Sequence, residues 1–493
     1  MSNKKINAVE AIGIIQRLND KTTYGQVYCN NFDTPFIGIL KKQKERGYKL
    51  AAFSKQHLSI DRDIVENITF QSHNAEYRLI DTFQNRIRHH HRDRKGTYSR
   101  RELQVNSFQP GGNFPDHSYL RAILPITEGF LSIHYFTVEP YSYITEPGKL
   151  SNASGLVRIT LLEDQFTICQ VRAGQELFLI IDCDAKMSYE TFRERCWAIS
   201  IGLAFVNGHL WQNEQYIFSY ATEDMTIPTT WRYTTLRPSI LTIYSGLTGN
   251  AASWLRGSAG LHQKYKGKTI EISTQALNKL CNWIHSCDAH KVIALLIIEA
   301  KRSSLLMMPA GFALALEGLA TLFEQKFPEK INPIKLRTKA KEFRDRLLSV
   351  LEDYRNDPDF NPTILQNKIN EINKATNRDR LKIPFKLLGI PLSGRDVLAL
   401  DYRNALLHGN VILEPMEEKT FEMNELELGM RLLTLTNAII LKWMGYKGWV
   451  VNHVKAQENA IGLTIDEEYY RDIGELEDID EDVMASPEGE AEV

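Results

Sequence analysis

Hydrophobic residues recur in short runs over the first half of the chain and with a helical period over the second half. Up to about residue 265, runs rich in β-branched and aromatic residues are bounded by Pro, Gly, Asn or Asp, a pattern typical of strands. The clearest runs predict strands at 34–40, 119–126, 130–138, 155–162, 165–171, 177–183 and 215–221. Those over 155–183 follow one another closely enough to predict an antiparallel meander, with turns at 163–164 and 173–174.

Helical periodicity first occurs inside this β-rich region, over 188–209, with Ser188 as the expected N-cap and Gly208 as the expected stop. From Ser273 onward every apolar segment has helical spacing, and Pro, Gly or Asn separates most of them. We expect a bundle of about seven helices that ends near Tyr446. The predicted fold class is therefore α+β.

The predicted organisation is a β-rich regulatory or sensing region over 1–265, followed by an all-α helical bundle over 270–450. The chain has 493 residues, of which 43% are hydrophobic, and this is enough for at least two cores. One helix, over 336–357, carries a marked amphipathic stripe. The stripe consists of Phe343, Leu347, Val350, Leu351 and Tyr354.

Charge is distributed unevenly along the chain. The formal net charge is −2, but residues 466–493 hold 13 acidic side chains and one basic one, which leaves the first 465 residues at +10. A basic body suits a polyanionic partner. The acidic segment has too few large apolar residues to fold alone, so we expect a disordered tail over 466–493. Such a tail either keeps the protein soluble or competes with RNA for the basic body.

Targeting and membrane signals are not evident. The six cysteines show no spacing that resembles a disulfide framework, and the N-terminal segment lacks the continuous apolar core of a secretory signal. The longest apolar stretch, 292–323, is interrupted by Glu299, Lys301 and Arg302, so we expect no membrane span. These features favour a cytoplasmic protein with reduced thiols.

The segment DYRNALLHGN contains the residue types best suited to chemistry: Arg403, Asn404 and His408. Asn404 and His408 are four residues apart in a predicted helix that Gly409 can terminate, so they share one face. A guanidinium can bind two phosphate oxygens at once, and an imidazole with a pKa near ~6.5 exchanges protons close to neutral pH. RNA supplies its own nucleophile, the 2′-hydroxyl. We therefore expect these three residues to be catalytic, with no metal and no cofactor.

These residues resemble the signature of the HEPN superfamily, in which an arginine, often followed by a polar residue, precedes a histidine by four to six residues. The resemblance covers about 270–447 and extends to an earlier apolar helix with an embedded acid, Glu317. It implies a metal-independent endoribonuclease that leaves a cyclic phosphate, with the site formed across a homodimer. RNA, including tRNA, is then the expected partner.

A β-rich region before a C-terminal bundle of this kind is also similar to the ApeA type of two-domain anti-phage proteins. That resemblance implies a toxin or abortive-infection effector with a phage-derived trigger. The alternative is a non-catalytic HEPN-type protein, a dimerisation or partner-binding module in which Arg403 and His408 pair with Asp401 or Glu317.

Other segments also contain residue types suited to binding or catalysis. The run RIRHHHRDRK is either a solvated surface loop or an RNA-backbone contact, and its candidate RNA-binding residues are Arg86, Arg88, Arg92, Arg94 and Lys95. The four Cys and His residues between 281 and 290 are spaced too closely for a structural zinc motif. Asp116 and His117 have no nucleophile near them in the sequence, so a turn is the simpler interpretation. No P-loop and no dinucleotide-binding fingerprint is present.

Overall fold

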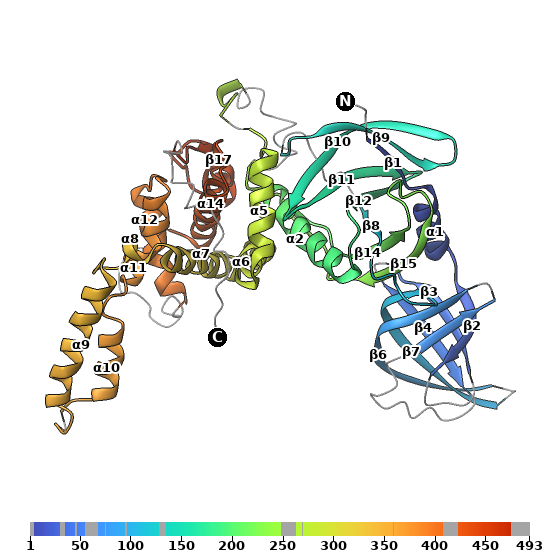
Figure 1. Cartoon of the computed structure of the whole chain (residues 1–493), viewed down its shortest axis with the longest axis horizontal. Helices are drawn as coiled ribbons and strands as arrows, with labels where there is room; N and C mark the ends of the chain where they lie inside the picture. The colour runs from blue at the N-terminus through green and yellow to red at the C-terminus, as the bar shows by residue number, and fades with distance from the viewer. Residues whose placement is uncertain are drawn as a thin grey trace. The chain divides into compact units, whose positions relative to one another are not determined.

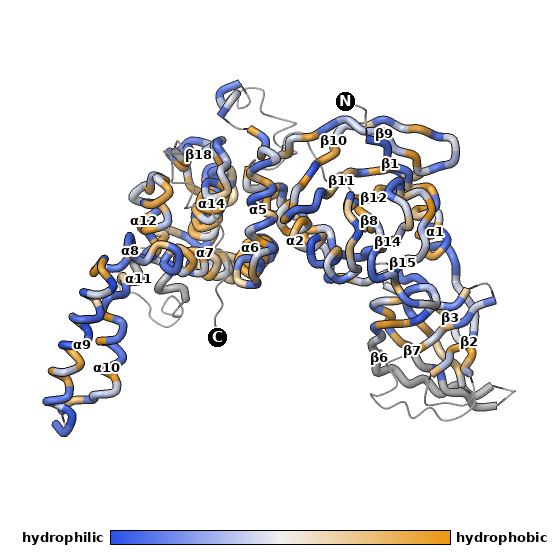
Figure 2. The backbone as a smooth tube through the Cα atoms, in the orientation of Figure 1, coloured by the Kyte–Doolittle hydropathy of each residue, from blue (hydrophilic) through white to orange (hydrophobic). Residues whose placement is uncertain are grey.

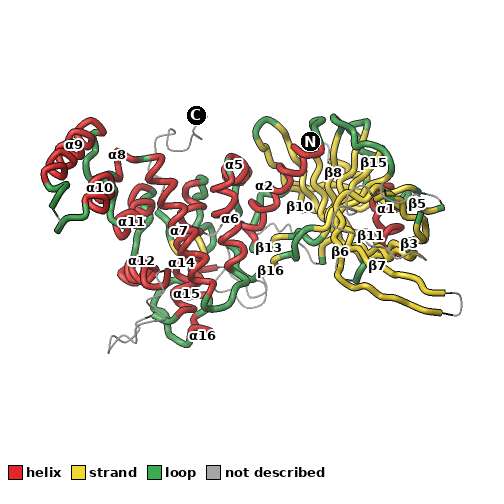
Figure 3. Tube along the Cα trace, turned by 90° about the horizontal axis from the view of Figure 1, so that it is seen from below, coloured by secondary structure: helices red, strands yellow, loops and turns green. Residues whose placement is uncertain are grey.

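The computed structural model describes residues 4–29, 35–44, 47–54, 68–73, 75–93, 96–127, 135–247, 263–268, 270–357, 359–407 and 423–474. The chain divides into two compact units. The first contains residues 1–242 and 271–285, and the second contains 243–270 and 286–493. The α+β prediction is confirmed, because the first unit is β-rich and the second is almost entirely helical (Figure 3).

Part of the first unit is a closed barrel (Figure 1). Its strands are β2 (Thr23–Tyr28), β3 (Phe36–Lys42), β4 (Tyr48–Ser54), β5 (Ile68–Ser72), β6 (Glu76–Asp93) and β7 (Gly96–Pro110). They are hydrogen-bonded in the order β7-β4-β3-β2-β5-β6, and β6 pairs again with β7. This closure leaves the ring without free edges. Alternate side chains such as Val27, Phe70 and Phe108 fill the interior.

The rest of the first unit is an open sheet that continues from the barrel, because β15 pairs with both β7 and β14. Its strands follow in the order β15-β14-β8-β12-β11-β10-β9-β1. Their bounds are β1 (Lys4–Asn7), β8 (Tyr119–Ile126), β9 (Glu139–Glu146), β10 (Lys149–Leu161), β11 (Asp164–Ala173), β12 (Glu176–Cys183), β14 (Glu214–Tyr220) and β15 (Pro228–Thr235). A short pair, β13 (His209–Leu210) and β16 (Ile240–Leu241), lies outside this sheet.

The predicted meander is confirmed as β10-β11-β12, with both pairs antiparallel. The strand ends pair Leu161 with Asp164 and Ala173 with Glu176, so each turn lies one residue from its predicted position. The helix predicted at 188–209 is α2 (Tyr189–Asn207). Ser188 accepts a hydrogen bond from the Thr191 amide, and Gly208 ends the helix with a positive φ of 87°. The strand predicted at 130–138 falls largely outside the described residues.

Helix α5 (Thr274–Ser286) corrects the predicted boundary between the domains. The sequence assigned it to the helical domain beginning at 270, but residues 271–285 belong to the first unit. Asn278 accepts a hydrogen bond from the Thr160 amide, and Asn282 bonds both the Thr160 carbonyl and the Leu162 amide. Two side-chain amides thus satisfy backbone groups of β10. At Gly202 of α2 an added Cβ would lie 2.7 Å from the Cys281 sulfur, so α2 and α5 pack closely.

The second unit is a bundle whose centre is formed by α7 (Met307–Lys326) and α14 (Glu425–Trp443). The other helices are α6 (Asp288–Ala300), α8 (Pro328–Ile331), α9 (Arg337–Asp353), α10 (Pro362–Asn370), α11 (Asn377–Leu387), α12 (Gly394–Leu407), α15 (His453–Ala456) and α16 (Glu458–Ile461). Helix α7 contacts α6, α11, α12 and α14. Both central helices are strongly hydrophobic along their length (Figure 2).

Among the described helices, α7 is long and apolar enough by length and composition to cross a membrane. Its apolar window is 50% buried inside the bundle, and helices pack on several of its sides. Core helices of soluble proteins have the same properties, so this helix is consistent with a soluble protein.

The acidic C-terminal segment does not begin as a disordered tail. Strand β18 (Tyr470–Arg471) pairs with β17 (Val450–Val451), and Tyr470 is buried. Glu467 binds Arg431 at 2.8 Å and accepts a hydrogen bond from Asn452, also at 2.8 Å. The prediction of a disordered tail is therefore wrong for residues 466–474. Composition alone could not predict the contact between Glu467 and the buried Arg431, because the two residues are far apart in the sequence. Residues 475–493 lie outside the described part of the chain.

Lys301 and His453 are buried together in the second unit. Burial lowers the pKa of Lys301 to about 7. Burial, together with the charge of Lys301, lowers the pKa of His453 to about 3. The histidine ring lies 5.8 Å from the Tyr244 ring and within 3.3 Å of the Asn437 amide nitrogen. Burial therefore disfavours the charged form of each residue in the folded state.

Stability should rise with pH above neutrality because of Lys301. Between pH 7 and 10.5 the unfolded lysine holds a proton that the folded one has released, so raising the pH favours folding. From pH 7 to 9.5 we expect a gain on the order of 2 kcal/mol from this group. Urea unfolding at the two pH values measures it, and Lys301→Met should be more stable than the parent at pH 7 and lack most of the gain. An equal pH response in both proteins would contradict the assignment.

Candidate functional site

Helix α12, which carries the predicted catalytic arginine, is fixed at its start. The Ser393 amide donates to Asp396 at 2.7 Å, and the Asp396 amide donates to the Ser393 hydroxyl at 3.1 Å, a reciprocal N-terminal cap. The Asp396 carboxylate also binds Arg431 of α14 at 3.2 Å and Arg471 of β18 at 2.8 Å. Because these partners come from distant parts of the sequence, the position and rotation of α12 are defined by long-range charge pairs.

Arg403 lies in the last turns of α12 and is fully buried. Its guanidinium forms an ion pair with Glu317 of α7, whose side chain is 32% exposed. Burial lowers the pKa of Arg403, but an arginine stays protonated in proteins. A buried cation needs an opposite charge beside it. Glu317 supplies this charge, and it is the partly exposed member of the pair.

A second arginine extends this cluster. Arg380 of α11 lies 4.0 Å from Glu317 and 3.8 Å from Glu324, and it is only partly buried. Helices α7, α11 and α12 thus bring two arginines and two glutamates together. The sequence analysis missed Arg380 and Glu324. Nothing in the local pattern distinguishes them from other surface charges, because their proximity comes from helix packing.

The other predicted catalytic residues are described less fully. Asn404 follows Arg403 in α12, and nothing is described of its side chain. His408 lies outside the described residues. Of the two structural partners considered for Arg403, Asp401 and Glu317, the ion pair is with Glu317. Whether His408 completes a site beside Arg403 stays a prediction.

The candidate RNA-binding run is a hairpin and not a surface loop. Arg86, Arg88 and Arg92 lie in β6, and the ladder with β7 continues to the pair Asp93–Gly96 (Figure 3). Arg94 and Lys95 lie outside the described residues. The polar composition of this segment does not predict that it pairs as strands.

Metal-ligating side chains do not gather anywhere in the described part of the chain: no group of three or more His, Cys, Asp or Glu is placed to hold an ion. Cys281 is buried against α2, and burial raises the pKa of its thiol to about 12. Cys287 is exposed ahead of α6, and His290 bonds the Ser286 hydroxyl at 2.8 Å.

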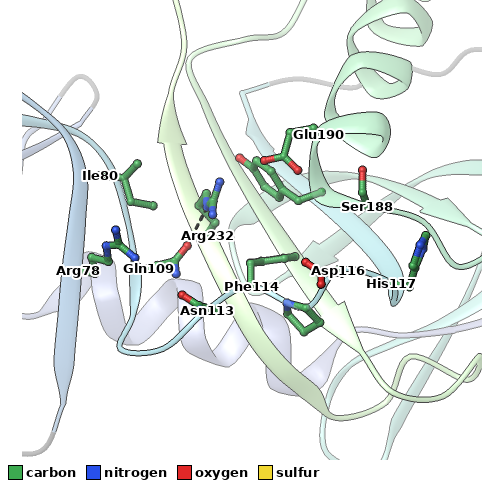
Figure 4. A pocket seen from close by; sticks show the side chains of 12 residues that line it. Arg78, Ile80, Gln109, Asn113, Phe114, Asp116, His117, Ser188, Glu190 and Arg232 are labelled. Atoms are coloured by element: carbon green, nitrogen blue, oxygen red, sulfur yellow. Dashed lines mark hydrogen bonds between the residues drawn. The ribbon is translucent and has the colours of Figure 1, made fainter. Parts of the chain in front are cut away.

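A separate polar cavity of about 500 Å³ lies in the first unit (Figure 4). Arg78, Gln109 and Arg232 lie at one end of it, and His117 and Ser188 at the other. Asp116 and Glu190 are between them. The sequence analysis treated Asp116 and His117 as turn residues, and it did not single out either arginine.

Comparison with protein-family models, with curated proteins and with solved structures finds no match.

Removing either partner of the Arg403–Glu317 pair should destabilise the second unit, and to different extents. Glu317→Ala leaves Arg403 charged and buried, so we expect a loss of about 2–4 kcal/mol in the free energy of unfolding. Arg403→Met removes the buried charge and leaves a carboxylate that water can reach, so its loss should be smaller. Denaturant unfolding measures both, with Glu371→Ala, an exposed acid on a surface turn, as the control. A larger loss for Arg403→Met would refute this account of the pair.

Proposed function

We propose that the second unit is a metal-independent endoribonuclease of the HEPN type. The observation that carries the proposal is the charged cluster of α7, α11 and α12. Its Arg403 precedes His408 in the sequence by five positions. The pairing with Glu317 also supports it, since an embedded acid on an earlier apolar helix was part of the resemblance to that superfamily.

The proposed reaction is an internal transfer at phosphorus. The 2′-oxygen of a ribose attacks the adjacent phosphate, the bond to the 5′-oxygen of the next nucleotide breaks, and a 2′,3′-cyclic phosphate remains. His408 takes or returns the proton, and Asn404 orients the scissile group. The buried Arg403 contributes positive charge to the site. Arg380 is partly exposed, and it binds the phosphate of the substrate.

One observation favours a second candidate function. Arg403 is fully buried and already paired, which also suits a structural role in a non-catalytic bundle that binds RNA or a protein partner. In that case the cluster holds α7, α11 and α12 together and does no chemistry. The two candidates differ in a single measurable property, RNA cleavage.

His408→Ala separates them. Purified protein should cut total RNA or tRNA in EDTA and leave cyclic phosphate ends, and His408→Ala should lower the rate by ~10²–10⁴ because a proton carrier is lost. Arg403→Lys, which keeps the charge but not the planar fork, should cut more slowly than the parent. The matched controls are His290→Ala and Arg355→Ala, residues of the same unit outside the cluster. Parental cleavage by His408→Ala, or no cleavage by the parent, would leave the binding protein as the better interpretation.

We further propose that two copies of the chain associate through α9. Helices α9 and α10 lie side by side, and neither contains a fully buried residue (Figure 1). Apolar side chains spaced alternately four and three residues apart run along α9, as in a coiled-coil seam. This α9 seam consists of Leu336, Ala340, Phe343, Leu347, Val350 and Tyr354. Leu336, Phe343, Val350 and Tyr354 are 58%, 46%, 55% and 43% exposed.

The α9 seam is complementary to a second copy of itself. In an antiparallel pair centred on residue 345, Leu336 meets Tyr354, Ala340 meets Val350, and Phe343 meets Leu347. The same register brings Arg337 to the level of Asp353 on both sides of the two-fold axis. A seam that is apolar, exposed and symmetric in this way favours a homodimer over an unrelated partner.

Val350→Glu should therefore convert a dimer into a monomer, because it places two charges in the middle of the buried seam. Ser349→Glu adds the same charge one residue away, outside the seam, and should remain dimeric. Sedimentation velocity at micromolar concentration measures the mass of each protein. A monomeric parent, or a dimeric Val350→Glu variant, would exclude this interface.

The biological setting follows from the same proposal. A cytoplasmic RNase of this kind is a toxin or an anti-phage effector whose partner is RNA, with tRNA among the candidates and a phage-derived signal as the trigger. Its toxicity on overexpression would then depend on His408.

A further inference from the structure

The cavity of the first unit is formed where three adjacent strands meet the start of α2. Arg78 of β6 lies opposite Gln109 of β7 in the ladder, and Arg232 of β15 bonds the same Gln109 from the other side. The two arginines therefore flank one buried amide in a row across β6, β7 and β15. The loop 111–117 and the first residues of α2 form the remaining wall (Figure 4).

Arg232 is held in a fixed orientation. Its Nε donates to the Gln109 side-chain oxygen at 2.8 Å, and the Gln109 amide nitrogen donates in turn to the Gly112 carbonyl at 2.7 Å. The guanidinium lies 4.0 Å from the centre of the Tyr189 ring and 5.4 Å from that of Phe114. A cation fixed by a buried amide and two rings loses little conformational freedom when it binds a ligand.

The positive charge at this end of the cavity is available for a ligand. Within the described residues, neither Arg78 nor Arg232 forms an ion pair with a carboxylate. Arg78 is exposed beside the cavity, and the terminal nitrogens of Arg232 remain after its Nε has bonded Gln109. Two guanidinium groups at one end of a concave site match the oxygens of a phosphate.

The rest of the cavity has different chemistry. Phe114 and Pro115 offer an apolar surface, and the carboxylates of Asp116 and Glu190 also line the cavity (Figure 4). Carboxylates accept hydrogen bonds from N–H and O–H groups. A ligand that suits the whole cavity therefore combines an anionic end, a flat ring, and hydroxyl or amino groups. The volume of about 500 Å³ is within the usual range for small-molecule sites.

We propose that this cavity binds a nucleotide, with its phosphate on Arg78 and Arg232, its base against Phe114, and its hydroxyl or amino groups on Asp116 and Glu190. The nucleotide is either free or the 5′-phosphorylated end of an RNA strand. The site is in the first unit and does not depend on the ribonuclease proposal, because none of its residues belongs to the charged cluster of the second unit.

Isothermal titration with the full chain carrying His408→Ala tests the site without RNA turnover. The probes are the four nucleoside 5′-monophosphates, the matching nucleosides, ribose 5-phosphate, and a short single-stranded RNA with a 5′-phosphate or a 5′-hydroxyl. At least one monophosphate should bind at least tenfold more tightly than both its nucleoside and ribose 5-phosphate. If the source is an RNA end, the 5′-phosphorylated strand should bind more tightly than the free nucleotide.

Arg78→Ala and Arg232→Ala should each weaken nucleotide binding at least tenfold, while Arg172→Ala, an exposed arginine of β11, should not. Phe114→Ala should remove the advantage of the nucleotide over ribose 5-phosphate. Circular dichroism verifies that the variants are folded, and Arg78 is exposed, so its removal should not disturb the barrel. Binding that survives the double substitution of Arg78 and Arg232, equal affinity for nucleotide and nucleoside, or no binding of any probe at millimolar concentration would overturn the proposal.

Discussion

The need to pair buried guanidinium groups shapes both units of this protein. Among the described residues, the three largest side chains that are fully buried are all arginines: Arg121, Arg403 and Arg431. An unpaired charge inside a protein is very costly, so each position constrains the elements around it to bring a carboxylate. In the first unit Arg121 of β8 meets Asp182 of β12 through two hydrogen bonds of 2.7 and 2.8 Å. Arg121 also donates to the carbonyls of Asn7 and Met225, which ties the end of β1 to the loop before β15.

In the second unit the ion pairs of two buried arginines, Arg403 and Arg431, hold helix α12 against its neighbours. Arg431 draws Asp396, Glu427 and Glu467 around it, and these come from α12, α14 and the C-terminal segment. Arg403 then joins the other end of α12 to Glu317 of α7. Both parts of α12 are thus tied by charge pairs to groups that are far away in the sequence. The acidic character of residues 466–472 has a structural use here, since Glu467 neutralises a core cation.

The arginines of the two candidate sites differ in their partners: Arg403 pairs with a carboxylate, whereas Arg232 bonds a neutral amide. Arg403 is fully buried and paired with Glu317, so any phosphate would have to compete with that carboxylate or approach through Arg380. Arg232 is instead held by a neutral amide and by aromatic rings, which fix its orientation without cancelling its charge. A guanidinium fixed by neutral groups keeps its full attraction for an anion, whereas one fixed by a carboxylate gives up most of it. The cavity of the first unit is thus the better prepared of the two for binding an anion.

The local sequence pattern was sufficient to predict many of the helices and strands, but it could not predict which distant residues contact one another. The α+β class, the β10-β11-β12 meander and the caps of α2 at Ser188 and Gly208 could be predicted, because alternation, turn residues and capping act over a few residues. The motif around Arg403 was likewise visible in the sequence. Tertiary structure alone decided that α5 belongs to the first unit, that the basic run 86–93 is a strand, and that 466–474 is folded. It also decided that Arg78 and Arg232 flank Gln109, although they are 154 positions apart. Each of these depends on a strand ladder or a charge pair between distant residues, and the free energy of such a contact exists only after the chain has folded.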